Sequence, residues 1–532
     1  MQKLLNILQK YFLPLLLAAW CAILLAQKID LPVADIGRHI KNGEIIVQTR
    51  WAEKWQVLHQ NYYSYTEPSH EFVNHHWLSG VIFYGVYELA GFEGLSIFYI
   101  AAVTLAFYLF FRAAQKQAGS SIAGILAVLV LPIIASRTEI RPEGFSYLLM
   151  AVFFWLLWHW RAGRLNPKWL FALPVLMMFW VNLHIGFIFG FLILGVFWIE
   201  ELIKDLRFKI QDKNYRFFYY KLHFLTIIGI LCAIAGLLNP FFIKGLLYPL
   251  NIFRQYGYLV VENQSVMFLE RLGMGSTLYF GLFKILLGLA FLSFILRLIK
   301  FRTWKDFPYS DILLLGSVGI LSFLAIRNFP IFGLLFLPIT ASNIKAVMPE
   351  LKHPAYKILP AVIAIVIVIF GSFRFWESYK FKQNVFGLGL MPKVEAAAEF
   401  FKKENIQGPI FNNYDIGGYL IFKLYPQMRV FTDNRPEAYS IDHFQKDYIP
   451  AQQDNEKWVK LEELHNFNAI FFSHRDFTPW GQAFLISRVE DPQWAPVFAD
   501  SYNIILVKRN EQNKALIEKF EIPKGRFGII KQ

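Results

Sequence analysis

The chain has few charged residues and almost no cysteine. Of its 532 residues only 17% are charged and 56% are hydrophobic, whereas about a quarter of a soluble globular protein is charged. The two cysteines, Cys21 and Cys232, both lie inside apolar runs, so neither a disulfide framework nor a cysteine-based metal site is available. There is no internal repeat of the kind found in transporters built from two related halves. These absences exclude an ordinary soluble enzyme and a disulfide-stabilised scaffold.

Long apolar runs are what the sequence has in abundance. Its mean hydropathy is +0.38, and runs of about 18 to 24 apolar residues suit a hydrocarbon core about 30 Å thick. The first run is interpreted as a membrane span and not as a signal peptide, because no convincing small-x-small cleavage site follows it. We expect about eleven transmembrane helices, at residues 12–27, 94–111, 120–136, 144–160, 168–182, 186–203, 222–238, 277–299, 309–326, 329–344 and 358–375.

The formal net charge of +14 is explained by where the charges lie and does not indicate nucleic-acid binding. Lysine and arginine are concentrated in every second loop, as between Arg161 and Lys168 and between Lys204 and Lys221, which is the pattern of cytoplasmic loops. With a cytoplasmic N-terminus, an odd number of spans puts the C-terminal domain outside. Short loops and the lack of a cysteine-rich exterior favour a bacterial inner membrane as the location.

The composition divides the chain into two domains. Residues 1–375 form the expected transmembrane domain, whose outer loop 28–94 holds two stretches, 36–47 and 77–89, suited to helices in the membrane interface. Residues 376–532 have the composition of a soluble domain. Strands are expected near 409–411, 429–432, 468–472 and 503–508, and helices at 392–403 and 419–424. The predicted fold is a polytopic α-helical membrane protein with a C-terminal extracytoplasmic α/β domain.

Asp35 is the strongest candidate for a catalytic residue. It follows the first expected span, in the sequence Val33-Ala34-Asp35-Ile36-Gly37-Arg38-His39. A carboxylate held at the membrane interface among desolvating neighbours can act as a general base toward a hydroxyl group. The structural alternative is a helix N-cap for the amphipathic stretch that follows.

Histidines in the outer loop form a second candidate group. His75 and His76 precede Trp77, and adjacent histidines on a helix point to different sides. They therefore bind a metal or a phosphate only together with His39 or a carboxylate. Trp77 is equally well explained as an ordinary interface aromatic.

Arginines on the outer side form a third group. Arg137 and Arg141 oppose the positive-inside bias, so they need an anionic partner, which a lipid phosphate or pyrophosphate would supply. The alternative is an ion pair with Glu139 or Glu143. Other outer residues that these arginines could meet are Asn182, His184, Glu262 and Arg327.

In the soluble domain, polar residues gather near the expected strand ends, where α/β domains bind ligands. Turn chemistry explains these residues equally well. They are Asn412, Asn413, Asp433 and Arg435.

Taken in order along the chain, these residues resemble the GT-C-type membrane glycosyltransferases, and among them the bacterial relatives of polyprenyl-phosphate-mannose protein mannosyltransferases. In that superfamily an acidic residue after the first span is catalytic, and Asp35 matches it. A second acid often stands two positions earlier, where this chain has Val33, with Asp30 the nearest upstream acid. This departure weakens a two-carboxylate or metal-bound mechanism. The resemblance rests on Asp35 with Arg38-His39, Tyr63 to Thr66, His75 to Leu78, Arg141-Pro142, Asn182 to His184, and residues 411–419 and 430–435.

The resemblance implies a hexosyltransferase that uses a lipid-phosphate-linked sugar. The acceptor hydroxyl would lose its proton to Asp35 and attack the sugar of a polyprenyl-phosphate donor with inversion, on the outer face of the membrane. No cofactor is required, and a divalent metal has no support in the residues. The implied partners are the donor lipid, a glycan, lipid or protein acceptor, and membrane lipids. The expected binding residues for donor phosphate and sugar are Arg38, His39, His75, His76, Arg137, Arg141, Asn182, His184, Glu262 and Arg327.

Two other classes of function stay open at the level of sequence. A lipid or solute transporter would carry charges along a path through the membrane, whereas the inner halves of the expected helices hold few ionisable residues. A non-catalytic scaffold of a cell-envelope assembly would leave the clustering of Asp35, the histidines and the outer arginines unexplained.

Overall fold

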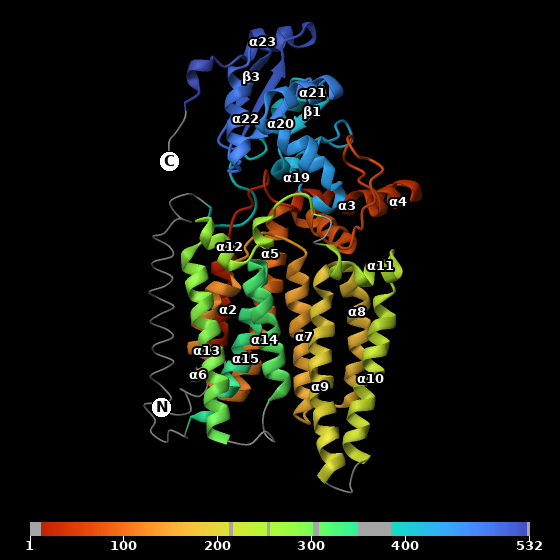
Figure 1. The fold of residues 1–532 in the computed structure, drawn as a ribbon, viewed down its shortest axis with the longest axis vertical. Coiled ribbons are helices and arrows are strands. Elements are labelled where there is room, and N and C mark those ends of the chain that lie inside the picture. The colour runs from red at the N-terminus through yellow and green to blue at the C-terminus, as the bar shows by residue number, and fades with distance from the viewer. Residues whose placement is uncertain (1–11, 212–215, 253–255, 302–307, 349–384, 529–532) are drawn as a thin grey trace. The chain divides into compact units, whose positions relative to one another are not determined.

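The computed structural model describes residues 12–211, 216–252, 256–301, 308–348 and 385–528 (Figure 1). The chain divides into two compact units. The first, here called the helical unit, consists of residues 1–27, 96–246 and 260–387, and the second, here called the mixed unit, of residues 28–95, 247–259 and 388–532. The outer loop 28–94, which the sequence analysis assigned to the transmembrane domain, therefore belongs to the same compact unit as the C-terminal residues.

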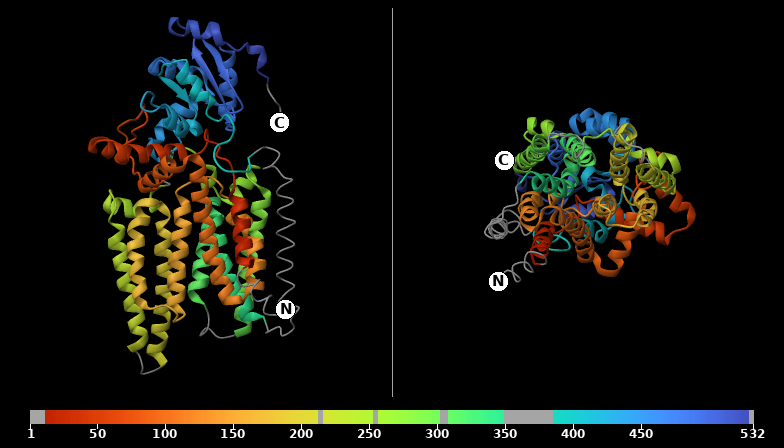
Figure 2. Two further views of the ribbon diagram at one scale, coloured as in Figure 1. Left: turned by 180° about the vertical axis from the view of Figure 1, so that it is seen from behind. Right: turned by 90° about the horizontal axis from the view of Figure 1, so that it is seen from below.

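Long apolar helices run side by side in the helical unit (Figures 1 and 2). They are α2 (Leu13–Leu25), the second part of α5 (Trp77–Ala118), α6 (Ser120–Ile134), α7 (Glu143–Arg161), α8 (Ala172–Leu183), α9 (Ile188–Gln211), α10 (Arg216–Gly236), α13 (Thr277–Phe301), α14 (Tyr309–Leu324) and α15 (Phe329–Val347). These helices correspond to the first ten of the expected spans. The eleventh, 358–375, lies outside the described residues, so the number of spans stays a prediction.

Four described segments are long and apolar enough to cross a membrane: Trp77–Ala118, Ile185–Leu206, Leu278–Phe301 and Ile326–Val347. The surface of α13 agrees with a lipid environment. Its large apolar side chains are well exposed, with Leu278 at 74%, Ile285 at 62% and Phe291 at 68%. A continuous apolar stripe of this kind is unfavourable in water but ordinary against lipid. The helical unit therefore has the character of a multi-pass membrane protein.

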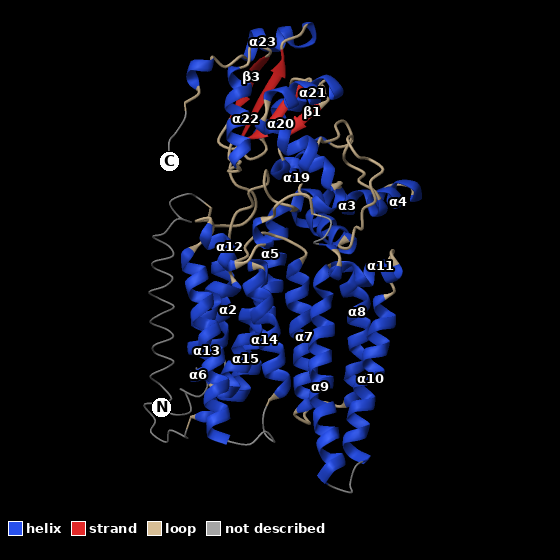
Figure 3. Ribbon diagram, viewed as in Figure 1, coloured by secondary structure: helices blue, strands red, loops and turns tan. Residues whose placement is uncertain are grey.

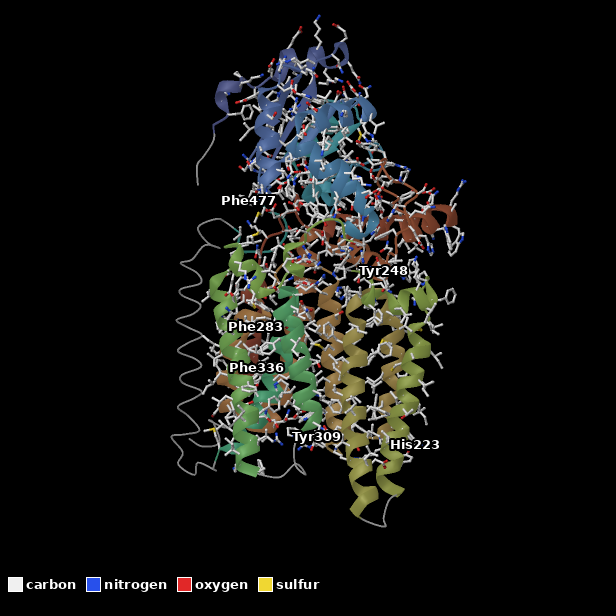
Figure 4. The ribbon with its side chains drawn as sticks, viewed as in Figure 1. His223, Tyr248, Phe283, Tyr309, Phe336 and Phe477 are labelled. Atoms are coloured by element: carbon white, nitrogen blue, oxygen red, sulfur yellow. The ribbon has the colours of Figure 1, made fainter. Side chains whose placement is uncertain are left out.

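Helix α15 forms the centre of one group of helices, since most of its residues are buried. Gly333 allows this close packing, because a Cβ atom there would lie 2.8 Å from Cγ1 of Ile134 on α6. On another side, Phe283 of α13 (Figure 4) stacks on Phe329 of α15 with ring centroids 4.5 Å apart. Shape complementarity and aromatic stacking thus hold these helices together where the hydrophobic effect between them is weak.

Helix α5 is broken near its middle. Gly91 has φ 62° and ψ −157°, a backbone conformation that glycine adopts without strain. The break separates the helix expected at 77–89 from the span expected at 94–111, and both predictions are confirmed as helical segments. The second segment runs on to Ala118, further than the sequence suggested.

The mixed unit contains a four-stranded sheet with the order β1-β2-β4-β3 (Figure 3). Strands β1 and β2 are parallel, and β4 is antiparallel to both β2 and β3. The strands are β1 (Ile410–Asn412), β2 (Ala469–Ser473), β3 (Trp494–Ala499) and β4 (Asn503–Lys508). The strands expected near 409–411, 468–472 and 503–508 are confirmed, whereas β3 was not predicted.

A strand was also expected at 429–432, and this prediction is wrong because the segment is not part of the sheet. Its backbone bonds instead to the outer loop and to one side chain: Val430 N–H donates to the Tyr63 carbonyl at 3.1 Å, and the amide of Asn412 donates to the Thr432 carbonyl at 2.8 Å. Asn412 also accepts from Phe431 N–H at 3.0 Å. The buried side-chain amide of Asn412 therefore satisfies backbone hydrogen-bonding groups that a neighbouring strand would otherwise satisfy.

Helices pack around the sheet and against the outer loop. Those of the C-terminal residues are α18 (Ala396–Lys403), α19 (Gly417–Leu424), α20 (Ile449–Gln453), α21 (Asn455–His465), α22 (Pro479–Glu490) and α23 (Lys514–Phe520), and those of the outer loop are α3 (Ile36–Gln48) and α4 (Trp51–His59). The predicted helix at 36–47 is confirmed by α3. At Gly37 a Cβ atom would lie 2.9 Å from Cβ of Phe422 and 3.2 Å from the Gly418 carbonyl oxygen. The absence of a side chain at Gly37 therefore lets α3 and α19 approach closely, which brings the residues around Asp35 next to the C-terminal segment.

Candidate active site

Asp35 lies directly before α3, and its carboxylate faces residues of the C-terminal segment. Within the described part of the chain its side chain makes no capping hydrogen bond to α3, so the N-cap interpretation is wrong in that sense. Its Oδ1 instead accepts a hydrogen bond from the amide nitrogen of Asn434 and lies 3.7 Å from Nη2 of Arg38. The side chain is 15% exposed, so it is largely desolvated and still reachable by a substrate.

Arg38 connects this carboxylate to the histidines. Its Nη1 lies 3.2 Å from Nε2 of His76, and Nδ1 of His76 lies 3.2 Å from Nε2 of His75. Because arginine can only donate, Nε2 of His76 accepts and its proton sits on Nδ1. His75 in turn donates from Nδ1 to the Val73 carbonyl at 3.3 Å. The hydrogen bonds then run in one direction, from Arg38 through His76 and His75 to the Val73 carbonyl.

Aromatic contacts complete this group. The ring of His39 meets that of His76 edge-on with centroids 4.7 Å apart, and the ring of Tyr248 (Figure 4) lies 5.3 Å from that of His75. Of the residues predicted from the sequence, the structure therefore brings Asp35, Arg38, His39, His75 and His76 together.

Asn434 is the member of this group that the sequence analysis missed. It is held by its two neighbours in the chain, since Arg435 donates to Asp433 through Nε at 2.7 Å and Nη2 at 2.6 Å. Arg435 also donates to the side-chain oxygen of Asn61 in the outer loop at 2.8 Å. Burial by itself would raise the pKa of Asp433, but the adjacent Arg435 outweighs it and lowers that pKa. The flanking Asp433 and Arg435 were noted in the sequence, but no local signal connects residue 434 to residue 35.

Asp30, the nearest upstream acid, has a different partner. Arg475 binds both of its carboxylate oxygens, at 2.8 and 2.9 Å. This two-pronged ion pair connects the start of the outer loop to the C-terminal residues. Among the described residues, no group of three or more histidine, cysteine, aspartate or glutamate side chains is placed to hold a metal ion.

A second polar group lies in the helical unit, at the end where α7 begins. Arg137 donates to Glu143 at 2.8 Å and to Glu262 at 2.6 Å, and Arg141 donates to Glu262 at 2.9 Å. Nη2 of Arg327 lies 3.9 Å from both carboxylates. Burial would raise the pKa of Glu262, but Arg141, Arg137 and Arg327 outweigh it and hold the pKa well below its usual range. The ion-pair alternative for the outer arginines is therefore confirmed, since Arg137 pairs with Glu143 and Arg141 pairs with Glu139 at 2.7 Å. Glu262 is a further partner that both arginines share.

Asn182 and His184 hold helix ends. The amide of Asn182 donates to the carbonyls of Met178 and Leu238, both at 2.8 Å. Nδ1 of His184 accepts from Gly186 N–H at 3.1 Å and lies 2.8 Å from the hydroxyl of Ser146. These contacts shape the connections that follow α8 and α10.

The opposite end of the helical unit also holds buried charges, so the expectation of few ionisable residues there is wrong. Arg161, at the end of α7, donates to Asp311 of α14 at 2.9 Å and to Glu200 of α9 at 3.2 Å. Lys204 binds Glu200 as well, at 2.6 Å. These side chains satisfy one another and tie the helix ends together, which is a structural role.

No protein-family model matches the chain, and no curated protein matches it. Solved structures do. The oligosaccharyltransferase AglB from Archaeoglobus fulgidus, in complex with an inhibitory peptide and a dolichol-phosphate, is 11% identical with a TM-score of 0.54, over 93% of this chain and 74% of that one. The same enzyme in complex with zinc and sulfate is 12% identical with a TM-score of 0.55, over 93% and 73%. ArnT from Cupriavidus metallidurans bound to undecaprenyl phosphate is 11% identical with a TM-score of 0.47, over 94% and 97%.

The likeness to AglB covers nearly the whole chain. At this level of identity it shows the fold, and it confirms that the chain resembles the GT-C-type membrane glycosyltransferases in architecture.

Proposed function

We propose that the chain is a membrane glycosyltransferase that moves a sugar from a polyprenyl-phosphate-linked donor to an acceptor hydroxyl on the outer face of the membrane. The observation that carries this proposal is the setting of Asp35, a largely buried carboxylate held by Asn434 and Arg38. Asp35 follows the first apolar helix, and the chain has the fold of AglB, whose structure contains a dolichol-phosphate. A dolichol-phosphate is a polyprenyl phosphate, the lipid part of the donor class proposed here.

In the proposed reaction, Asp35 takes the proton of the acceptor hydroxyl while the oxygen attacks the anomeric carbon of the donor sugar. The bond between that carbon and the phosphate oxygen breaks, and the lipid phosphate leaves with the electron pair. Attack from the face opposite the phosphate inverts the anomeric configuration. The leaving group is already a stable anion, so it requires positive charge and hydrogen-bond donors more than a general acid.

In the helical unit, Arg137, Arg141 and Arg327 are the proposed ligands of a polyprenyl phosphate. In the structure their donors converge on the carboxylate of Glu262. A phosphate offers the same kind of oxygen with more negative charge, so it can take the place of Glu262 between Arg137 and Arg141. In the mixed unit, Arg38, His39, His75 and His76 are the proposed sugar contacts around Asp35. Asn182 and His184 are left out of the proposed site, because their contacts hold helix ends.

Glu262→Gln tests the phosphate site. The amide keeps the shape of the side chain but no longer neutralises the arginines, so a polyprenyl phosphate is expected to bind about tenfold more tightly, which is about 1.4 kcal/mol. Titration of undecaprenyl phosphate into protein in nanodiscs measures this affinity. Glu270→Gln is the control, since Glu270 pairs with Lys284 at an exposed position and its loss is expected to change nothing. Weaker or equal binding by the Glu262 variant would mean that Glu262 is a structural partner and not a displaceable one.

The proposed reaction is tested with the wild-type chain in nanodiscs and a panel of radiolabelled polyprenyl-phosphate sugars. We expect label to pass from one donor into a lipid, glycan or protein fraction, with release of the lipid phosphate and inversion at the anomeric carbon, which NMR of the product reads directly. Movement of an intact donor across a vesicle membrane would favour a flippase. A failure of transfer from every donor would refute the proposal and favour a scaffold.

A further inference from the structure

The amide of Asn434 joins the two charged side chains on which the proposed chemistry depends. Its nitrogen donates to Oδ1 of Asp35, and its oxygen accepts from Nε of Arg38 at 3.2 Å. Only this orientation of the amide is favourable. The reverse would put its oxygen against the carboxylate and its N–H groups against the guanidinium. Asn434 is therefore matched at both ends to partners 399 and 396 residues away in the chain.

The surroundings leave this amide little freedom. On one side lies the first turn of α19, where a Cβ atom at Gly418 would come within 3.1 Å of the Asn434 amide nitrogen and oxygen. On either side along the chain, Asp433 and Arg435 form a fully buried ion pair, with 0% and 1% of the side chains exposed. The backbone of Asn434 is thus anchored, and its side chain is confined between α3 and α19.

We infer that Asn434 is a positioning residue, which orients the carboxylate of Asp35 for proton transfer and keeps Arg38 directed toward His76. This inference rests on the proposed function. It gives the C-terminal segment a part in the chemistry itself, because the residue that orients the base comes from there. A carboxylate with one oxygen fixed by an N–H donor presents a defined geometry to the acceptor hydroxyl, which is a requirement for efficient proton transfer.

Asn434→Asp is the most informative substitution, because it keeps the volume and replaces the N–H donors with a carboxylate oxygen. At neutral pH the new carboxylate repels Asp35, and kcat is expected to fall about 10- to 100-fold with KM for the donor little changed. Asn413→Asp is the matched control. Asn413 is also buried, donates to a carboxylate, that of Asp476, at 3.1 Å, and accepts from Ser473 N–H at 2.9 Å, but it lies outside this group. Its variant is expected to lose thermal stability without the loss of kcat.

The pH profile separates positioning from a purely structural role. When two neighbouring carboxyls share one proton, the protonated one donates an O–H where asparagine donates an N–H. The ratio of kcat for Asn434→Asp to that of the wild type is therefore expected to rise as the pH falls from about 7.5 to about 5. The charged and titratable groups around the pair are Arg38, His76, Tyr414, Asp433, Arg435 and Glu437, and they are the same in both proteins. A flat ratio would overturn the inference.

A second measurement is independent of sugar transfer. A hydrophobic carbodiimide modifies protonated carboxyl groups, and mass spectrometry of the peptide that contains residue 35 gives the rate. Asn434→Ala removes a donor that stabilises the charged carboxylate, so Asp35 is expected to react about tenfold faster, and Asn413→Ala is expected to have no such effect. Faster labelling of Asp35 in Asn434→Ala, together with no sugar transfer by the wild-type protein, would support the contact between Asn434 and Asp35 and refute the proposed function. Unchanged labelling, or full kcat in Asn434→Asp, would overturn the inference while the proposed function stands.

Discussion

Replacement of Asp35 by asparagine is expected to lower the rate of sugar transfer by about 10²- to 10⁴-fold, the range that a general base contributes. The variant keeps the size of the side chain, so α3 and the packing around it are preserved. It loses the group that accepts the hydroxyl proton, and its amide can present only one acceptor oxygen to Asn434. Radiolabelled transfer from the donor identified in the panel measures the effect, at saturating donor and acceptor.

Asp30→Asn is the control for this substitution. Asp30 also follows the first apolar helix, but it is engaged by Arg475, with 21% and 30% of the two side chains exposed. Loss of an ion pair at this exposure changes stability by about 0–1 kcal/mol, so transfer close to that of the wild type is expected. Equal transfer by the Asp35 and Asp30 variants would remove Asp35 from the mechanism.

Arg435→Ala is expected to destabilise the protein by about 3–5 kcal/mol, because it leaves a buried carboxylate without its partner. Asp433 would keep only neutral donors such as the hydroxyl of Tyr439 at 2.9 Å. The guanidinium also packs over the rings of Phe72 at 4.9 Å and Tyr63 at 5.3 Å, so its removal opens a cavity as well. Because the same ion pair anchors Asn434, activity is expected to fall with stability.

Thermal unfolding of the full chain in detergent measures this loss. Arg509→Ala serves as the control, since Arg509 pairs with Glu521 where about a third of each side chain is exposed, and about 0–1 kcal/mol is expected there. The double replacement Asp433→Asn with Arg435→Met removes both charges and is expected to recover part of the stability. A midpoint for Arg435→Ala no lower than that of Arg509→Ala would contradict the assignment of this pair as a structural anchor.

Much of the fold follows from local pattern. Apolar runs predict the described helices of the helical unit, because a span must satisfy its own backbone hydrogen bonds and bury its surface in lipid. The amphipathic pattern after Asp35 predicts α3, and short apolar runs predict β1, β2 and β4. The segment at 429–432 is mispredicted because its backbone groups form their hydrogen bonds with the outer loop and with the side-chain amide of Asn412, and not with a neighbouring strand. A pattern of residues does not specify which backbone or side chain becomes the partner.

The identity of the site residues is likewise predictable from the sequence, whereas their partners are not. The sequence by itself singles out Asp35, the outer histidines and the outer arginines, because charged groups beside apolar spans are costly and need partners. It also places Asp433 and Arg435 in one short loop. Their partners are a matter of tertiary structure: Glu262 joins arginines from two other loops, and Asn434 reaches Asp35 across 399 residues of chain. Such contacts depend on how whole elements pack, as α3 does against α19 at Gly37, and packing is decided by complementary surfaces that no single segment of sequence contains.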